Sequence, residues 1–259
     1  MLSRFHAMIL SFRTINYVVT CCVMAWAACA VPAQAALVLN GTRVVFPERE
    51  RDVTVRVENT SEQPVLAQSW VDDGRVDVPP EQLQVPFIVA PSLKRVEPGR
   101  SAVLRITHTP ASLPGDRESI YWLNVLEVPA GPKDAGNQLR FGFRTRIKLF
   151  FRPTAIADGV DAAPDQLVWK TAAAAPGAGG RGVVLEVANP TPYYVSFGKV
   201  ESDAGGTFVS AGGGMVAPFD RAQFALLGVA ASTRKPATVR YMVIDDYGGR
   251  TTITKKLAD

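Results

Sequence analysis

Short runs in which apolar and polar side chains alternate are the feature that most limits how this chain can fold. In one run, Val53, Val55 and Val57 alternate with polar or charged residues. Residues 139–151 extend the same pattern over a longer segment. A period of two is typical of a strand with one buried face, whereas an amphipathic helix repeats every 3.6 residues. Because no sustained helical period appears and Pro, Gly, Asn and Asp separate the runs, the sequence predicts an all-β chain built of sandwiches.

The pattern is interrupted after Pro153. Residues 154–164 are rich in Ala, Asp, Gly and Pro and have no clear period. Strand-like runs then resume at residues 182–188, 193–200, 222–227, 238–244 and 251–255. We therefore expect two β-sandwich domains, residues 36–153 and 154–259, joined by a short linker.

The first 35 residues are expected to be a secretory signal peptide. Arg4 and Arg13 give a positively charged start, residues 18–31 carry no charge, and Ala-Gln-Ala at 33–35 supplies the small residues of a cleavage site. The uncharged run is shorter than the roughly 20 residues that span a bilayer, so no membrane span is expected. All the cysteines of the chain lie in this segment: Cys21, Cys22 and Cys29. The exported protein should therefore fold without a disulfide and depend on its hydrophobic cores.

The charge of the chain argues against a nucleic-acid partner. The formal net charge is only +4, and no nucleic-acid-binding motif is present. One strand-like segment nevertheless gathers cations: Arg140, Arg144, Arg146, Lys148 and Arg152. A solvated strand face would explain Arg140 and Arg144. It explains Lys148 less well, because apolar residues surround it and a lysine in such a place usually has a partner.

No catalytic, cofactor or metal site is expected. His108 is the only histidine outside the predicted leader, no G-x-S-x-G motif occurs, and we interpret His108 as a surface residue at a strand end. Residues 177–182 match G-x-G-x-x-G, but a strand follows where a helix is needed, which favours a hairpin loop. Asp245 and Asp246 precede Tyr-Gly-Gly and are typical of a turn between strands. Without cysteines outside the leader, the usual Cys/His zinc site is also excluded.

Several short motifs follow one another through nearly the whole chain after the leader. They are GTRVVFP at 41–47, QSWV at 68–71, DRES at 116–119, YWLNV at 121–125, RIKLFFRP at 146–153, NPTPYY at 189–194 and DYG at 246–248. Each is weak alone, but the ordered set resembles the periplasmic chaperones of the chaperone–usher pilus pathway. The resemblance implies two immunoglobulin-like domains in a boomerang arrangement, in the periplasm. It also implies a non-enzymatic protein without a cofactor, which binds pilus or fimbrial subunits and delivers them to an outer-membrane usher.

The resemblance also implies how a subunit is held. Family members bind subunits whose own sandwich lacks its last strand, and a strand of the first domain fills the gap, which is called donor-strand complementation. Leu139, Phe141 and Phe143 are the expected donor residues, since apolar side chains at every second position suit a groove. By motif, Arg43 and Lys148 are expected to hold the terminal carboxylate of the subunit.

Three further charged residues match family positions that form an ionic network between the domains: Glu118, Arg152 and Asp246. Arg140 and Arg144 make the expected donor strand more basic than the usual family pattern. Both solubility of the empty chaperone and selectivity for its subunits remain open as explanations. Self-association of the empty chaperone also remains open, as do the subunit, the usher and the pilus type.

A secreted two-domain adhesin or carbohydrate-binding module is the alternative from another class. Such a protein would need an aromatic platform or calcium ligands on its loops. The candidate aromatic residues Trp70, Trp122 and Trp169 are better explained as strand residues, because each lies in an alternating or apolar run.

Overall fold

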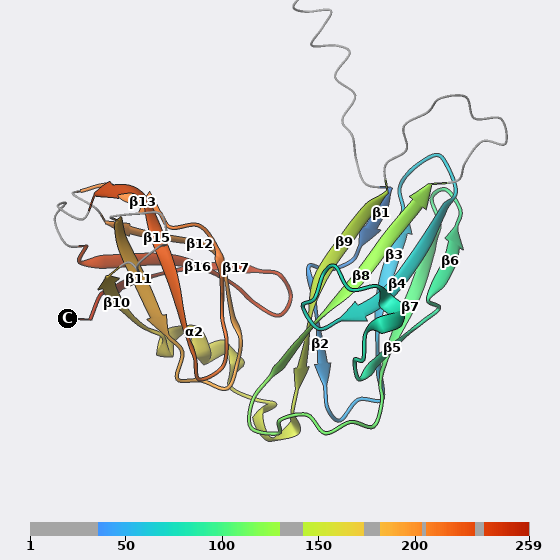
Figure 1. Cartoon of the computed structure of the whole chain (residues 1–259), viewed down its shortest axis with the longest axis horizontal. Helices are drawn as coiled ribbons and strands as arrows, with labels where there is room; N and C mark the ends of the chain where they lie inside the picture. Colours follow the sequence, from blue (N-terminus) through green and yellow to red (C-terminus); the bar gives the residue numbers. More distant parts are fainter. Residues whose placement is uncertain (1–35, 130–141, 174–181, 204–205, 231–235, 259) are drawn as a thin grey trace, which may run out of the picture. The chain divides into compact units, whose positions relative to one another are not determined.

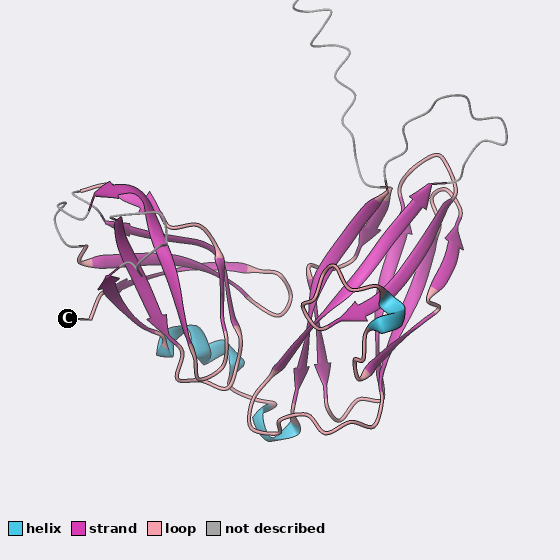
Figure 2. Ribbon diagram, viewed as in Figure 1, coloured by secondary structure: helices cyan, strands magenta, loops and turns pink. Residues whose placement is uncertain are grey.

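The computed structural model describes residues 36–129, 142–173, 182–203, 206–230 and 236–258. Within these ranges nearly all regular structure is β, arranged as two sandwiches with separate cores (Figures 1 and 2). The predicted all-β, two-sandwich fold is therefore confirmed. The remaining elements are short helical turns: η1 (Pro80–Gln82), η2 (Thr154–Ile156), η3 (Val160–Ala162) and α2 (Ala163–Gln166).

The first sandwich consists of two sheets, with strand orders β1-β3-β7-β5 and β2-β9-β8-β4-β6. The strands are β1 (Leu37–Leu39), β2 (Arg43–Pro47), β3 (Asp52–Asn59), β4 (Val65–Asp72), β5 (Phe87–Ala90), β6 (Leu93–Val96), β7 (Ser101–His108), β8 (Ser119–Pro129) and β9 (Phe143–Arg152). Every pairing is antiparallel except that of β2 with β9, which is parallel.

The alternating runs of the sequence place their apolar residues in this first core. Val55 and Val57 on β3 are buried, and Leu104 and Ile106 on β7 are fully enclosed. Their polar neighbours along the strand face outward, because successive side chains of a strand point to opposite faces.

The second sandwich has strand orders β10-β11-β15 and β13-β12-β16-β17, with β14 paired to β12. Its strands are β10 (Val168–Ala173), β11 (Gly182–Ala188), β12 (Val195–Asp203), β13 (Phe208–Ser210), β14 (Gly214–Val216), β15 (Arg221–Ala230), β16 (Thr238–Ile244) and β17 (Arg250–Lys256). Trp169 is the centre of its core and contacts the rings of Phe197, Phe224 and Tyr241. A buried Trp169 offers no platform for a sugar.

Both sandwiches use the same turn, built around a buried asparagine. Asn59 Nδ2 donates to the carbonyls of Gln63 and Val96, and Asn189 Nδ2 donates to those of Tyr193 and Ala217. In each case the asparagine Oδ1 accepts a backbone N–H two residues further along the chain. Side-chain bonds of this kind satisfy the polar groups of a turn that would otherwise be buried without partners.

Two local predictions have different outcomes. Asp245 and Asp246 begin the turn between β16 and β17, as expected, and Gly248 N donates to the Asp245 carbonyl. His108 does end a strand, as expected, but it is only partly exposed rather than free on the surface. Its ring packs against those of Phe46, Phe87 and Phe151, and burial lowers its pKa, although the charge of Glu48 opposes that shift.

The first core generates a stability prediction. Leu104→Ala should lower the free energy of unfolding by roughly 2–5 kcal/mol, because it removes a fully buried side chain and leaves a cavity. Val103→Ala is the matched control, since Val103 is 57% exposed on the opposite face of the same strand and should change the value by less than about 0.5 kcal/mol. Urea unfolding measures both. Equal losses in the two variants would contradict the assignment of the core face.

Candidate functional site

The parallel pairing of β2 with β9 brings Arg43 and Lys148 together. They are direct partners in the register of the two strands, although they lie far apart in the sequence. Only long-range strand pairing could place them side by side.

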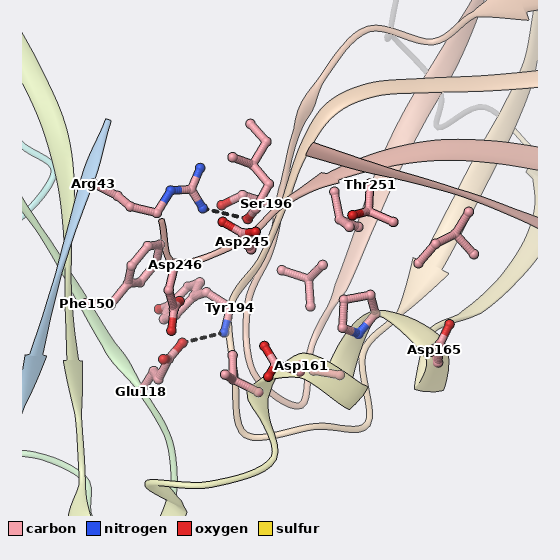
Figure 3. Close-up of a pocket in the computed structure, with 17 residues that line it drawn as sticks. Arg43, Glu118, Phe150, Asp161, Asp165, Tyr194, Ser196, Asp245, Asp246 and Thr251 are labelled. Carbon is pink, nitrogen blue, oxygen red and sulfur yellow. Dashed lines mark hydrogen bonds between the residues drawn. The ribbon is translucent and has the colours of Figure 1, made fainter. Parts of the chain in front are cut away.

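Each of the two cations is hydrogen-bonded to the second sandwich. Arg43 Nη1 donates to the Ile244 carbonyl at 2.7 Å, and Lys148 Nζ donates to Ser196 Oγ at 2.9 Å. Arg43 and Ser196 also line a cavity of about 340 Å³, with Tyr194 and Phe150 among its other walls. Figure 3 shows the Arg43 guanidinium directed toward the side of this cavity where Ser196 and Asp245 lie.

The two cations share a setting that disfavours positive charge. Burial first, and the nearby Arg43 charge second, together lower the pKa of Lys148 to about 8. Burial also lowers the pKa of Arg43, against the opposing charges of Asp246 and Asp245. Among the described residues, neither cation forms an ion pair within 4.0 Å. An anion placed between them would therefore relieve both like-charge repulsion and desolvation.

Arg152 connects two carboxylates beside this site. Its Nε donates to Glu118 Oε1 at 2.8 Å and its Nη1 to Asp246 Oδ2 at 2.7 Å. The other Glu118 oxygen accepts the backbone N–H of Tyr194 at 2.8 Å. Burial raises the pKa of Glu118, while Arg152 opposes that shift. Burial also works against the charge of Arg152, but bonds to Asp246 and the charge of Glu118 outweigh it and raise its pKa. The structure thus brings together the three residues expected to form an ionic network.

The expected donor strand is only partly within the described residues. Leu139 and Phe141 lie outside them, whereas Phe143 begins β9 and is 43% exposed. Residues 143–147 pair with β8 along one edge. On the other edge β2 pairs only with 148–152, and no strand in the described part of the chain continues that pairing toward Phe143. The unpaired edge runs directly into Lys148.

Two groups of site residues were not found from the sequence. Ser196 and Ile244, which hold the cations, lie in ordinary strand runs that carry no signal of a site. Asp72 was also missed, although it is the buried carboxylate that Arg144 and Arg146 contact. Only the unusual density of arginines on one face of β9 could have indicated that a partner was needed.

Two absences hold for the described ranges. No helix there is long and apolar enough to cross a membrane. No group of three or more His, Cys, Asp or Glu residues there could hold a metal ion.

The fold and the site define a two-domain, immunoglobulin-like β-sandwich protein with paired cations next to an unpaired strand edge. The chain belongs to the pilus-assembly chaperones of the PapD family. Residues 36–157 match the family model described as "Pili and flagellar-assembly chaperone, PapD N-terminal domain". Residues 162–255 match "Pili assembly chaperone PapD, C-terminal domain". The resemblance seen in the motifs is thereby confirmed.

Individual relatives support the same assignment. Chaperone protein FimB/FhaD of Bordetella pertussis is 38% identical, over 90% of this chain and 93% of its own length. The crystal structure of the Pseudomonas aeruginosa CupB2 chaperone is similar with a TM-score of 0.70 and 51% identity, covering 85% of this chain and 100% of that one. The Salmonella enterica SafB chaperone, solved in complex with the SafA pilin, has a TM-score of 0.70 and 27% identity, covering 88% of this chain and 99% of that one.

The burial of Lys148 generates a prediction about pH. The pKa of Lys148 should be about 8 in the folded protein, against 10.5 when unfolded. The unfolded state then binds more protons between these pH values, so this group makes the wild-type stability rise as the pH increases from about 8 to 10.5. Unfolding free energies of the wild type and Lys148→Met, compared across that range, should show the rise only in the wild type.

Arg43→Met separates the two causes of the shift. Because burial is the larger cause, this variant should raise the Lys148 pKa only part of the way back toward 10.5. Titration of the lysine side-chain resonances by NMR measures the value directly. A wild-type Lys148 that titrates near 10.5 would contradict the buried setting beside Arg43 described above.

Proposed function

We propose that the protein is a periplasmic chaperone that captures pilus or fimbrial subunits, completes their fold by donor-strand complementation and delivers them to an outer-membrane usher. One observation carries the proposal. The edge of β9 that no described strand pairs leads without a break into two cations, neither of which forms an ion pair within 4.0 Å among the described residues.

The open edge fits a partner whose sheet is incomplete. Residues 143–147 present backbone groups over roughly 17 Å, at about 3.3 Å per residue. Phe143 adds an exposed aromatic ring at the start of this segment. A subunit that lacks a strand exposes a matching edge and an apolar groove, both of which promote aggregation. Pairing the two edges satisfies both backbones and buries Phe143, which contributes roughly 1.5–3 kcal/mol before ordering costs.

The cation pair supplies an end point for the added strand. A terminal carboxylate bound by Arg43 and Lys148 would make charge-assisted hydrogen bonds in a partly buried site. It would also set the register of the subunit strand along β9. Register matters because a shift of one residue would turn every side chain of the added strand to the wrong face.

The network of Glu118, Arg152 and Asp246 has a supporting role in this proposal. Asp246 is bound to Arg152 and lies close enough to Arg43 to oppose the lowering of its pKa. Glu118 fixes the backbone of Tyr194, another wall of the cavity. The network thereby positions the surroundings of the anion site without contacting the subunit.

The comparisons support the choice of partner. The similar SafB chaperone is solved in complex with a pilin. Binding alone would drive the proposed activity, so no catalytic group or nucleotide is required. Self-association of the empty protein through the same edge remains open.

The carboxylate anchor is tested by charge reversal. Arg43→Glu combined with Lys148→Glu should weaken binding of a pilus subunit at least about 100-fold, because each acidic residue would repel the terminal carboxylate. Arg56→Glu with Arg105→Glu is the matched control, since both residues are exposed on the opposite sheet of the same sandwich. Co-purification from a periplasmic extract measures the effect. Wild-type yield with the folded double variant would rule out the anchor.

The donor edge is tested at its exposed ring. Phe143→Asp should reduce the affinity for a subunit at least about tenfold, since a charge would enter an apolar groove. Phe208→Asp is the control, because Phe208 is 40% exposed and lies in the second sandwich. Surface plasmon resonance with a purified subunit measures the affinity of each variant. Only Phe143→Asp should lose affinity. Equal losses would mean that exposure of an aromatic ring, rather than its place on β9, decides the result.

A further inference from the structure

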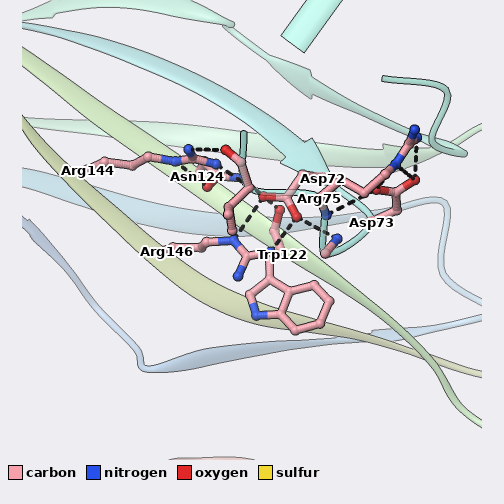
Figure 4. A network of polar contacts seen from close by, with 9 residues as sticks. Asp72, Asp73, Arg75, Trp122, Asn124, Arg144 and Arg146 are labelled. Atoms are coloured by element: carbon pink, nitrogen blue, oxygen red, sulfur yellow. Dashed lines mark hydrogen bonds and ion pairs between the residues drawn. The ribbon is translucent and has the colours of Figure 1, made fainter. Parts of the chain in front are cut away.

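The face of the β9–β8–β4 sheet turned away from the core carries an unusual charge cluster. Arg144 and Arg146 on β9 converge on Asp72, at the end of β4, and the Asp72 side chain is 0% exposed (Figure 4). Arg146 Nε donates to Asp72 Oδ2 at 2.9 Å, and its Nη2 donates to the other oxygen. Arg144 Nη2 donates to Oδ2 at 3.3 Å. One buried carboxylate is therefore shared by two guanidinium groups.

Neighbouring groups complete the cluster. Asn124 lies on β8, between β9 and β4. Its Nδ2 donates to Asp72 Oδ2 at 2.8 Å, and its Oδ1 accepts from Arg144 Nε at 2.8 Å. Gly74 N donates at 2.7 Å to Asp72 Oδ1, the oxygen that also accepts from Arg146 Nη2. Burial would raise the pKa of Asp72, but these bonds, that of Arg146 first, outweigh burial and lower it. The carboxylate is thus ionised and fully bonded.

The two arginines also lie over tryptophan rings of the adjacent strands. Arg144 is 4.8 Å from the ring centre of Trp70 on β4, and Arg146 is 4.3 Å from that of Trp122 on β8. Cation–π contacts of this kind add to the ion pairs. Asp72, Asn124, Arg144 and Arg146, with the two tryptophans, tie β9 to β4 across β8; we call this set the Asp72 clamp.

The Asp72 clamp lies on the half of β9 that has the fewest other contacts to hold it, and this position indicates its role. Arg144 and Arg146 belong to the half of β9 that is paired along one edge only. In this half only Ile147 is buried in the core, while Phe143 is 43% exposed. A strand end held by one neighbour and one core residue would open readily in solution. The arginine side chains alternate with Phe143 and Ile147, so they stand on the opposite face from the expected groove contacts.

Each of the three nitrogens of the Arg144 guanidinium donates a hydrogen bond within the protein. Its Nε, Nη1 and Nη2 donate to Asn124, the Val76 carbonyl and Asp72 respectively. A guanidinium bound in this way is poorly placed to select subunits, and its partial burial argues against a role in solubility alone. The structure favours a third explanation for Arg144, whereas Arg140 lies outside the described residues.

We propose that the Asp72 clamp keeps residues 143–147 extended and paired with β8 before any subunit arrives, so that the donor edge is preformed. Arg144 and Arg146 are then positioning residues that act through the backbone of β9. The consequence for binding rests on the proposed function. If only one free molecule in ten has residues 143–147 paired with β8, the apparent dissociation constant for the subunit is ten times larger.

Amide hydrogen exchange on the free protein tests the clamp directly. Arg144→Met and Arg146→Met keep an apolar stem over each tryptophan but remove the charge and the donors. In each variant the amides of 143–147 that donate to β8 should exchange at least about tenfold faster. The amides of the β3–β7 ladder and of the second sandwich should not change. Arg75→Met is the matched control, because the exposed Arg75 pairs with Asp73 beside the clamp and should leave β9 exchange unaltered.

Association kinetics with a purified pilus subunit test the consequence. In each variant the association rate constant should fall by about the same factor as the exchange protection of residues 143–147. The stability of the second sandwich against urea should change little. Unaltered exchange in both variants would overturn the proposal, as would acceleration spread evenly over the whole first sandwich. Local acceleration with an unchanged association rate would overturn the positioning role. If the wild type binds no subunit, the proposed function fails, yet the exchange data still decide whether the clamp preforms the edge.

Discussion

The parallel pairing of β2 with only the second half of β9 is the constraint on which the rest of the site depends. It aligns Arg43 with Lys148, and among the described strands it leaves residues 143–147 without a partner on that side. Lys148 and the open edge therefore lie on one continuous strand, with Arg43 beside them. A longer β2 would close the edge, and a shorter one would separate the cations.

Several side chains on or beside β9 have environments that are unfavourable in the free protein. Two cations share a partly buried position, and an aromatic ring faces solvent at the start of β9. Both arrangements are destabilising in the free protein and would be relieved by a bound chain with a carboxylate end. Well-satisfied networks lie on either side, around Arg152 and around Asp72. The strain is thus confined to the surface that a partner would cover.

Local pattern predicted the strands well, because period-two alternation depends only on neighbouring residues. The runs containing Val55 and Phe143 are β3 and β9, as expected. The pairing of Arg43 with Lys148 could not come from spacing, since the register of two distant strands is a tertiary property. It came from the family resemblance. The partners Ser196 and Asp72 were missed, as was the packing of His108, for the same reason: their environments are formed by distant segments.

The repeated asparagine turn relates the two sandwiches strand by strand. Asn59 N donates to the carbonyl of the residue just before β7, and Asn189 N to that of the residue just before β15. By this correspondence β17 matches β9, since β17 pairs with β16 as β9 pairs with β8. The β17 sequence RTTITKK is mostly polar and exposed. Charged side chains on an edge strand discourage pairing with another chain, so β17 is protected where β9 begins with an exposed aromatic ring.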